Sequence, residues 1–220
     1  MSQLELKYFY TLEWSPAVTD IREQYPLPLD QTLEIAGRLQ IKHPTDPKTK
    51  EAAVMTTDFV IDVCTAGGTE LRARTVKMAK DLNSRRALEK LEIERTWWQE
   101  QGMDWGIVTE NEIPEPLAAN VRWVHKARDL SSAPDISPHI LGQIEHGLSK
   151  QMERRRNPLA HAALAVDEQL GLEPGSSLWV VRHLIANRYW LVDMNTVIDT
   201  GKPLAVTRSY MKINQAGDSA

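Results

Sequence analysis

Residues 54–77 constrain the fold most, because two runs rich in β-branched residues are joined there by Gly67-Gly68. Glycine accepts the positive φ that tight hairpin turns require, so this pattern predicts an antiparallel β-hairpin. If Gly67 and Gly68 occupy the turn, Asp58 lies directly opposite Lys77 on the same side of the sheet. The Cβ atoms of such cross-strand partners are about 5 Å apart.

The Asp58–Lys77 pair has two interpretations. An Asp opposite a Lys in a hairpin is most often a surface ion pair that contributes little to stability. Here Asp58 precedes the apolar run 59–61, and Lys77 directly follows Val76. A charge inside an apolar strand is costly unless it is paired or binds a metal ion. The surroundings therefore favour a functional pair.

Length and composition limit the class of protein. The 220 residues suffice for one large domain or two small ones, and the single cysteine, Cys64, excludes an intramolecular disulfide. Neither a secretory leader nor an apolar stretch of about 18 residues is present in the sequence. We therefore expect a cytoplasmic protein with no membrane partner.

Charge is distributed unevenly along the chain. The net charge of −4 argues against a general nucleic-acid coat protein. Residues 72–90 nevertheless contain seven basic and two acidic residues, which form either a phosphate-attracting surface or a solvated helix face. Together with a second basic run, this segment supplies the residues that we expect to contact the DNA backbone: Arg72, Arg74, Lys80, Arg85, Arg86, Arg154, Arg155 and Arg156.

Helical and strand periodicities predict an α/β first domain, residues 1–130. Its first helix, over residues 2–13, has Ser2 as its cap and places Glu5 on or beside the apolar face. The other predicted elements around the hairpin are a strand at 18–25, a helix capped by Asp30, a long helix at 84–101, a strand at 105–109 and a helix that closes the domain near residue 130.

A linker rich in Ser and Pro, residues 131–138, precedes a second domain. Three helices are expected there, at 138–155, 158–171 and 176–187, and a β-wing that pairs 189–193 with 202–206. Three helices and a hairpin predict an α+β winged-helix domain over residues 131–206, followed by a polar tail at 207–220. Basic and acidic residues balance after residue 130, and the expected recognition helix offers only Arg182, His183 and Arg188. We therefore expect this domain to bind a protein partner more than DNA.

Glu5, Asp58 and Lys77 are the residues that carry chemistry. Two carboxylates can hold Mg²⁺ through oxygen ligands, and a lysine can orient or polarise the attacking water. The sequence contains no phosphate-binding Gly-Lys-Ser/Thr loop, no cysteine pair for zinc and no Gly-x-Ser-x-Gly nucleophile motif.

Several segments together resemble the TnsA family, the endonuclease subunits of heteromeric transposons, including CRISPR-associated ones. The resemblance covers nearly the whole chain. The segments that carry it are Ser2-Gln3-Leu4-Glu5, Asp20-Ile21-Arg22-Glu23-Gln24-Tyr25-Pro26-Leu27, Leu33-Glu34-Ile35-Ala36, Ile41-Lys42-His43-Pro44, Thr57-Asp58-Phe59, Thr75-Val76-Lys77, Trp105-Gly106-Ile107-Val108-Thr109-Glu110 and Arg182-His183-Leu184-Ile185-Ala186.

The resemblance implies a restriction-endonuclease-like fold for the first domain, with Glu5, Asp58 and Lys77 as its catalytic residues. It implies a Mg²⁺ site, which Mn²⁺ can also fill, on Glu5, Asp58 and the Val76 backbone. Three further residues are implied in secondary roles: Gln24, Thr75 and Glu94. Thr75 departs from the family, which has Gln two residues before the lysine.

The implied activity is hydrolysis of the 5′ strand at the ends of a transposon, with a TnsB-like transposase and a TnsC-like ATPase as partners. Two alternatives stay open: a catalytically idle adaptor with a nuclease fold, and a stand-alone restriction-like or repair nuclease. The intact Glu5, Asp58 and Lys77 argue against the adaptor. The neutral second domain argues against the stand-alone nuclease. We expect the isolated protein to cleave poorly.

Overall fold

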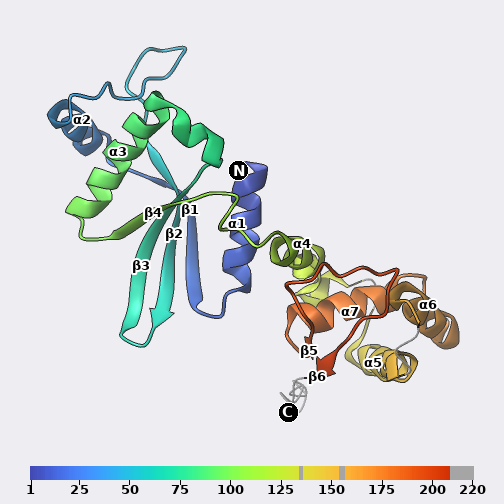
Figure 1. Ribbon diagram of the computed structural model, residues 1–220. Helices are drawn as coiled ribbons and strands as arrows, with labels where there is room; N and C mark the ends of the chain where they lie inside the picture. The colour runs from blue at the N-terminus through green and yellow to red at the C-terminus, as the bar shows by residue number, and fades with distance from the viewer. Residues whose placement is uncertain (134–135, 154–156, 209–220) are drawn as a thin grey trace. The chain divides into compact units, whose positions relative to one another are not determined.

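The computed structural model describes residues 1–133, 136–153 and 157–208, which form two compact units (Figure 1). The first unit is Met1–Pro114, and the second begins at Glu115. This division falls earlier than the boundary expected at residue 130. The predicted DNA contacts Arg154, Arg155 and Arg156 lie outside the described residues, as does most of the expected tail.

A four-stranded sheet in the order β1-β2-β3-β4 forms the centre of the first unit. Its strands are β1 Val18–Pro26, β2 Thr56–Thr65, β3 Gly68–Val76 and β4 Asp104–Val108. β1, β2 and β3 pair antiparallel in succession, whereas β4 runs parallel to β3. The parallel crossover from β3 to β4 contains the 3-10 helix η1, Ala79–Asn83, and the long helix α3, Arg85–Glu100.

The β2–β3 hairpin forms as predicted, but its register differs by two residues from the expected one. Thr65 pairs with Gly68 and Phe59 with Arg74, so Ala66 and Gly67 occupy the turn. Gly68 supplies the positive φ, at 119°, from the first position of β3. A slip of two residues keeps every side chain on its expected face, because side chains alternate with a period of two.

Helices cover both faces of this sheet. Val60 and Ala73 face the main core, which they share with α2, Leu29–Arg38, and α3. The neighbouring residue Phe59 points to the opposite face, where its ring packs edge-on against Tyr8 of α1, Gln3–Trp14, at 5.4 Å between centroids. The unit is therefore a three-layer α/β/α structure, and β2 is buried on both sides.

Two helix starts can be compared with their predictions. Ser2 caps α1 as expected, and its hydroxyl accepts from the Glu5 backbone N–H. The prediction that Asp30 caps α2 is wrong, because that helix begins one residue earlier and its N-cap, Pro28, has no side-chain acceptor. Asp30 instead lies in the first turn, where a carboxylate is favourable next to the positive end of the helix dipole.

The second unit contains the three predicted helices, α5 Pro138–Glu153, α6 Leu159–Leu170 and α7 Ser176–Ala186. The helix α4, Glu115–Val124, which we expected to close the first domain, packs against α7 instead.

The predicted partner of the β-wing is wrong. The strand β5, Trp190–Leu191, pairs with β6, Thr207–Arg208, and not with residues 202–206. The two residues of β6 therefore belong to the unit and not to a loose tail. Among the described helices, none is both long and apolar enough to cross a membrane.

Candidate active site

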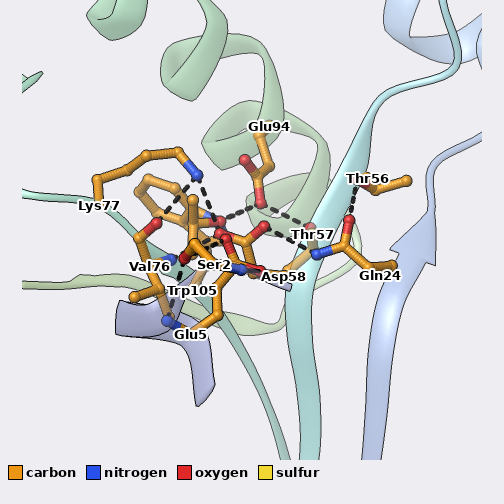
Figure 2. Close-up of polar contacts among 11 residues, drawn as sticks. Ser2, Glu5, Gln24, Thr56, Thr57, Asp58, Val76, Lys77, Glu94 and Trp105 are labelled. Atoms are coloured by element: carbon orange, nitrogen blue, oxygen red, sulfur yellow. Dashed lines mark hydrogen bonds and ion pairs between the residues drawn. The ribbon is translucent and has the colours of Figure 1, made fainter. Parts of the chain in front are cut away.

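Asp58 is buried near the start of β2, with 7% of its surface exposed, and its two carboxylate oxygens have different partners. Oδ2 accepts from the Val76 backbone N–H at 2.8 Å and from the Lys77 ammonium at 3.0 Å. Oδ1 accepts from the side-chain amide of Gln24 at 3.3 Å (Figure 2). The carboxylate is thus anchored through one oxygen to β3, and the other oxygen faces β1.

Lys77 directly follows β3 and reaches back along it. Besides Asp58, its ammonium contacts the carbonyl oxygen of Val76 at 3.0 Å. The sequence predicted that Asp58 and Lys77 lie close together, and the structure brings them into hydrogen-bond contact. They are not directly opposite in register, because β3 ends at Val76 and the long lysine side chain spans the difference. Lys77 keeps about a third of its side chain exposed, so its charge remains accessible.

A second carboxylate, Glu94 of α3, is buried beside the hairpin with 4% of its surface exposed. Its Oε1 accepts from Thr57 at 2.6 Å, from the Trp105 indole at 3.1 Å and from the Thr75 hydroxyl. Burial raises the pKa of Glu94 above its ordinary value of 4.5, and these three donors partly offset that rise. The negative charge of Asp58 raises the pKa of Glu94 further.

The Glu94 network explains the departure at position 75. Thr75 is buried and directs its hydroxyl to Glu94. Sequence reasoning identified Thr75 and Glu94 but missed Thr57 and Trp105, which complete the network. A buried indole N–H usually needs an acceptor, so Trp105 in a buried strand was the available signal.

Gln24 lies in β1 between the registered pairs Glu23–Phe59 and Tyr25–Thr57, so it faces Asp58. Its side-chain oxygen accepts from Thr56 at 3.1 Å while its amide nitrogen donates to Asp58 (Figure 2). Its backbone φ is +50°, a left-handed conformation that a non-glycine residue rarely adopts inside a strand.

Glu5 is in the first turn of α1, one turn before Tyr8, which packs on β2. Figure 2 draws Ser2 and Glu5 in the same view as Asp58, Val76 and Lys77, although no described hydrogen bond or ion pair joins the Glu5 carboxylate to these three residues. The Glu5 carboxylate accepts from the Ser2 backbone N–H at 3.1 Å and from its hydroxyl at 2.9 Å. Each carboxylate oxygen has two acceptor positions, so this capping box leaves one on each oxygen.

The donor set suits a hard cation. In the part of the chain that the structure describes, no three His, Cys, Asp or Glu side chains are grouped closely enough to hold a metal ion. Mg²⁺ does not need such a group, because proteins often hold it with one or two carboxylates while waters and substrate phosphates complete the shell. Asp58 Oδ1, the Glu5 carboxylate and the Val76 carbonyl are oxygen donors of the required kind.

A cavity of about 510 Å³ opens beside this cluster. Thr75, Lys77 and Glu94 line one part of it, and Arg86 and Lys90 of α3 line another. The remaining wall includes apolar side chains such as Met55 and Leu91. Three cations, Lys77, Arg86 and Lys90, therefore border the cavity together with the carboxylates Asp81 and Glu94, and the cations are suitable partners for a phosphodiester backbone.

Most arginines of the basic segment have acidic partners. Arg72 contacts Glu70 at 2.8 Å, and Arg74 contacts Asp104 at 2.7 Å with only 18% of its side chain exposed. The arginines Arg85 and Arg86 both bond Glu89. Lys80, in η1, is exposed. Among the residues expected to contact DNA, Arg72 and Arg74 on β3 thus have side chains that are most occupied by acceptors within the protein.

Of the three candidate DNA-reading residues, Arg182 and His183 lie on α7, and both point inward. Arg182 donates to the Trp123 carbonyl at 2.7 Å and its guanidinium lies over the Trp123 ring. His183 is buried, stacks on Trp179 and contacts the Ala127 carbonyl at 2.8 Å. These side chains hold α7 within its own unit.

Comparison with known proteins covers both units. The family described as TnsA-like endonuclease N terminal matches residues 15–110, and the family described as TnsA endonuclease C terminal matches residues 112–194. The transposon Tn7 transposition protein TnsA of Escherichia coli is 36% identical over 189 residues, which are 86% of this chain and 67% of that protein.

Proposed function

The chain belongs to the TnsA family of transposition endonucleases, and on this basis we propose that it hydrolyses the 5′ strand at transposon ends with the help of Mg²⁺. The observation that carries the proposal is the buried Asp58 in direct contact with Lys77 on one hairpin. Such a pair places a metal-binding oxygen beside a cation that can serve a phosphate.

We assign the metal to Asp58 Oδ1, the Glu5 carboxylate and the Val76 carbonyl, with Mn²⁺ as a substitute. When bound, the metal would neutralise charge on the scissile phosphate and lower the pKa of a coordinated water. Asp58 offers Oδ1 for this role because Oδ2 already accepts from Val76 and Lys77.

Lys77 has the second role. Two of its three ammonium protons are used by Asp58 and Val76, which leaves the third for the attacking water or a phosphate oxygen. Its contact with Asp58 fixes the ammonium in place. Glu94 acts through its neighbours, because Thr57 and Thr75 link it to the two strands that carry Asp58 and Lys77.

The DNA strand would follow the cavity beside Lys77. Arg86 and Lys90 lie one helical turn apart on α3 and both line this cavity, so they can contact successive phosphates. We assign lesser roles to Lys80 and Arg85, and weaker ones to Arg72 and Arg74, since their acidic partners compete with phosphate.

The second unit is proposed as a winged-helix domain that binds protein. Three helices and the short β5–β6 pair support this fold, and the inward Arg182 and His183 support a role other than reading DNA. The proposed partners are a TnsB-like transposase and a TnsC-like ATPase in the bacterial cytoplasm.

The test is Asp58→Asn in a reconstituted cleavage reaction on transposon-end DNA with the partner transposase and Mg²⁺. We expect 5′-strand cleavage to fall by at least about a hundredfold while the melting temperature changes little. Asp62→Asn is the matched control, because Asp62 lies on the same strand but pairs with Arg22. Full cleavage by Asp58→Asn would contradict the proposal and favour an idle adaptor.

A further inference from the structure

Gln24 combines two features that are unusual in one residue. It lies inside β1, yet its backbone is left-handed, with φ of +50°. Its exposed side chain connects the hydroxyl of Thr56 to the Oδ1 of Asp58, at 3.1 and 3.3 Å (Figure 2). Left-handed residues other than glycine are strained and cluster at functional sites, where the surrounding structure holds them in place.

The strained backbone of Gln24 is connected to the contact between its side chain and Asp58. A regular strand would place residue 24 in the pleat, with its side chain normal to the sheet. The left-handed residue interrupts the ladder between the pairs Glu23–Phe59 and Tyr25–Thr57, and at this interruption the Gln24 side chain reaches Asp58. The cost in backbone energy thus accompanies two hydrogen bonds, one from Thr56 and one to the Asp58 oxygen that β3 does not hold.

We propose that Gln24 is a positioning residue, which fixes the rotation of the Asp58 carboxylate so that Oδ1 keeps one lone pair directed at the metal. The proposal deepens the proposed function and rests on it. Gln24 touches neither the substrate nor the metal in this role. Thr56 fixes the orientation of the Gln24 amide, because its hydroxyl donates to the amide oxygen and leaves the nitrogen toward Asp58.

The chain offers a matched control. Gln40, directly after α2, is also an exposed glutamine at positive φ, 56°, but it lies at a helix end where no contact with the site exists among the described hydrogen bonds. Glycine adopts positive φ without strain. Gln40→Gly should therefore raise the melting temperature by about 2 °C, whereas Gln24→Gly gains the same relief of strain but also loses the hydrogen bonds to Thr56 and Asp58, so its melting temperature should rise less.

Cleavage should separate the two variants. We expect Gln24→Gly to lower kcat by about 10- to 100-fold with KM for DNA unchanged, the usual effect of losing a residue that orients a metal ligand. Gln40→Gly should cleave at the wild-type rate. Gln24→Leu, which keeps a bulky side chain but lacks the amide, should lose kcat like Gln24→Gly and covers the case in which the glycine variant folds poorly.

A third measurement reports on Asp58 without metal or DNA. The Val76 amide proton is bound by Asp58 Oδ2, so its hydrogen exchange shows how firmly the carboxylate is seated. Exchange at Val76 should be about fivefold faster in Gln24→Leu than in wild type, and unchanged in Gln40→Gly.

The outcomes separate this inference from the proposed function. Full kcat in both Gln24 variants, with Asp58→Asn inactive, would overturn the positioning role alone. Unchanged exchange at Val76 in Gln24→Leu would also overturn it. The positioning role is supported if both Gln24 variants lose kcat, Val76 exchanges faster in Gln24→Leu, and Gln40→Gly changes neither quantity.

Discussion

The buried Glu94 shows at the scale of one residue how the site combines charge with an apolar environment. Its pKa is raised chiefly by burial, so the native protein binds a proton at this carboxyl at higher pH than the unfolded chain does. Native stability from this group is therefore greatest in acid and falls as the pH rises from about 4.5 through the raised pKa.

Glu94→Gln removes this titration and keeps an oxygen for the three donors. We expect the melting temperature of the variant to exceed that of wild type above the native pKa, and the difference to vanish below about pH 4. Thermal unfolding followed from pH 4 to pH 8 measures this difference.

Glu92→Gln on the same helix is the control, since the hydrogen bonds from Arg95 lower the pKa of Glu92. Loss of the Glu92 carboxylate should slightly destabilise the protein at neutral pH, which is the opposite of the effect expected for Glu94→Gln. Parallel pH profiles for wild type and Glu94→Gln would show that Glu94 is not shifted upward.

Sequence reasoning predicted the proximity of Asp58 and Lys77, whose signal is local, and missed the contacts whose signal is tertiary. Asp58 and Lys77 stand in apolar runs, so their chemistry is visible in the chain. Thr57 and Trp105 have the sequence pattern of ordinary strand residues. Their hydrogen bonds to Glu94 form only because the strands pack against α3. Nothing in the sequence gives the left-handed backbone of Gln24.

At the scale of elements, α3 connects the core to the surface of the site. Trp97 and Trp98 anchor one side of the helix in the core. Arg86 and Lys90, near its N-terminus, border the cavity beside Lys77. The helix thus holds half-buried Arg86 and exposed Lys90 at a fixed place relative to β2 and β3.

The double variant Arg86→Ala/Lys90→Ala should weaken DNA binding and make it less sensitive to salt. Each lost phosphate contact reduces the slope of log K against log salt by about 0.9, so we expect a reduction of nearly 2. Binding measured between 50 and 200 mM salt, roughly the usual working range, gives the slope. Arg95→Ala is the control, because Arg95 forms the same kind of helical ion pair as Arg86 but does not line the cavity. An unchanged slope in the double variant would place the DNA elsewhere.

The elements themselves were largely predictable, and their partners were not. Periodicity and caps located α1, α3 and the hairpin, because these signals lie within each segment. The register of the hairpin was two residues off, since Gly68 supplies its positive φ from within β3 and not from the turn. The contact between α4 and α7 depends on packing between distant segments, which no local pattern encodes.

For the whole molecule, charge is the governing property. The net charge of −4 opposes approach to DNA, and the arginines of β3 are engaged by Glu70 and Asp104. A catalytic site of this kind needs help to reach its substrate. A partner that already holds the transposon end would supply that help.

We therefore expect the purified protein with Mg²⁺ and transposon-end DNA to cleave at least about a hundredfold more slowly than the same mixture with the partner transposase. Strand-specific gel analysis of end-labelled DNA measures both rates. A partner preparation that cannot bind DNA is the control. Equal cleavage in both mixtures would mean that assembly does not regulate the site.

The hairpin that joins Asp58 and Lys77 also bears on how the chain folds. These two residues are 19 positions apart, whereas Gln24 is 34 positions from Asp58 and Glu94 is 37 from Thr57. Contacts between residues near in sequence close small loops and form at low entropic cost. Asp58 and Lys77 can thus meet as soon as the β2–β3 hairpin forms, before β1 and α3 pack against it. We therefore expect the contact between Asp58 and Lys77 to form before the contacts that support it.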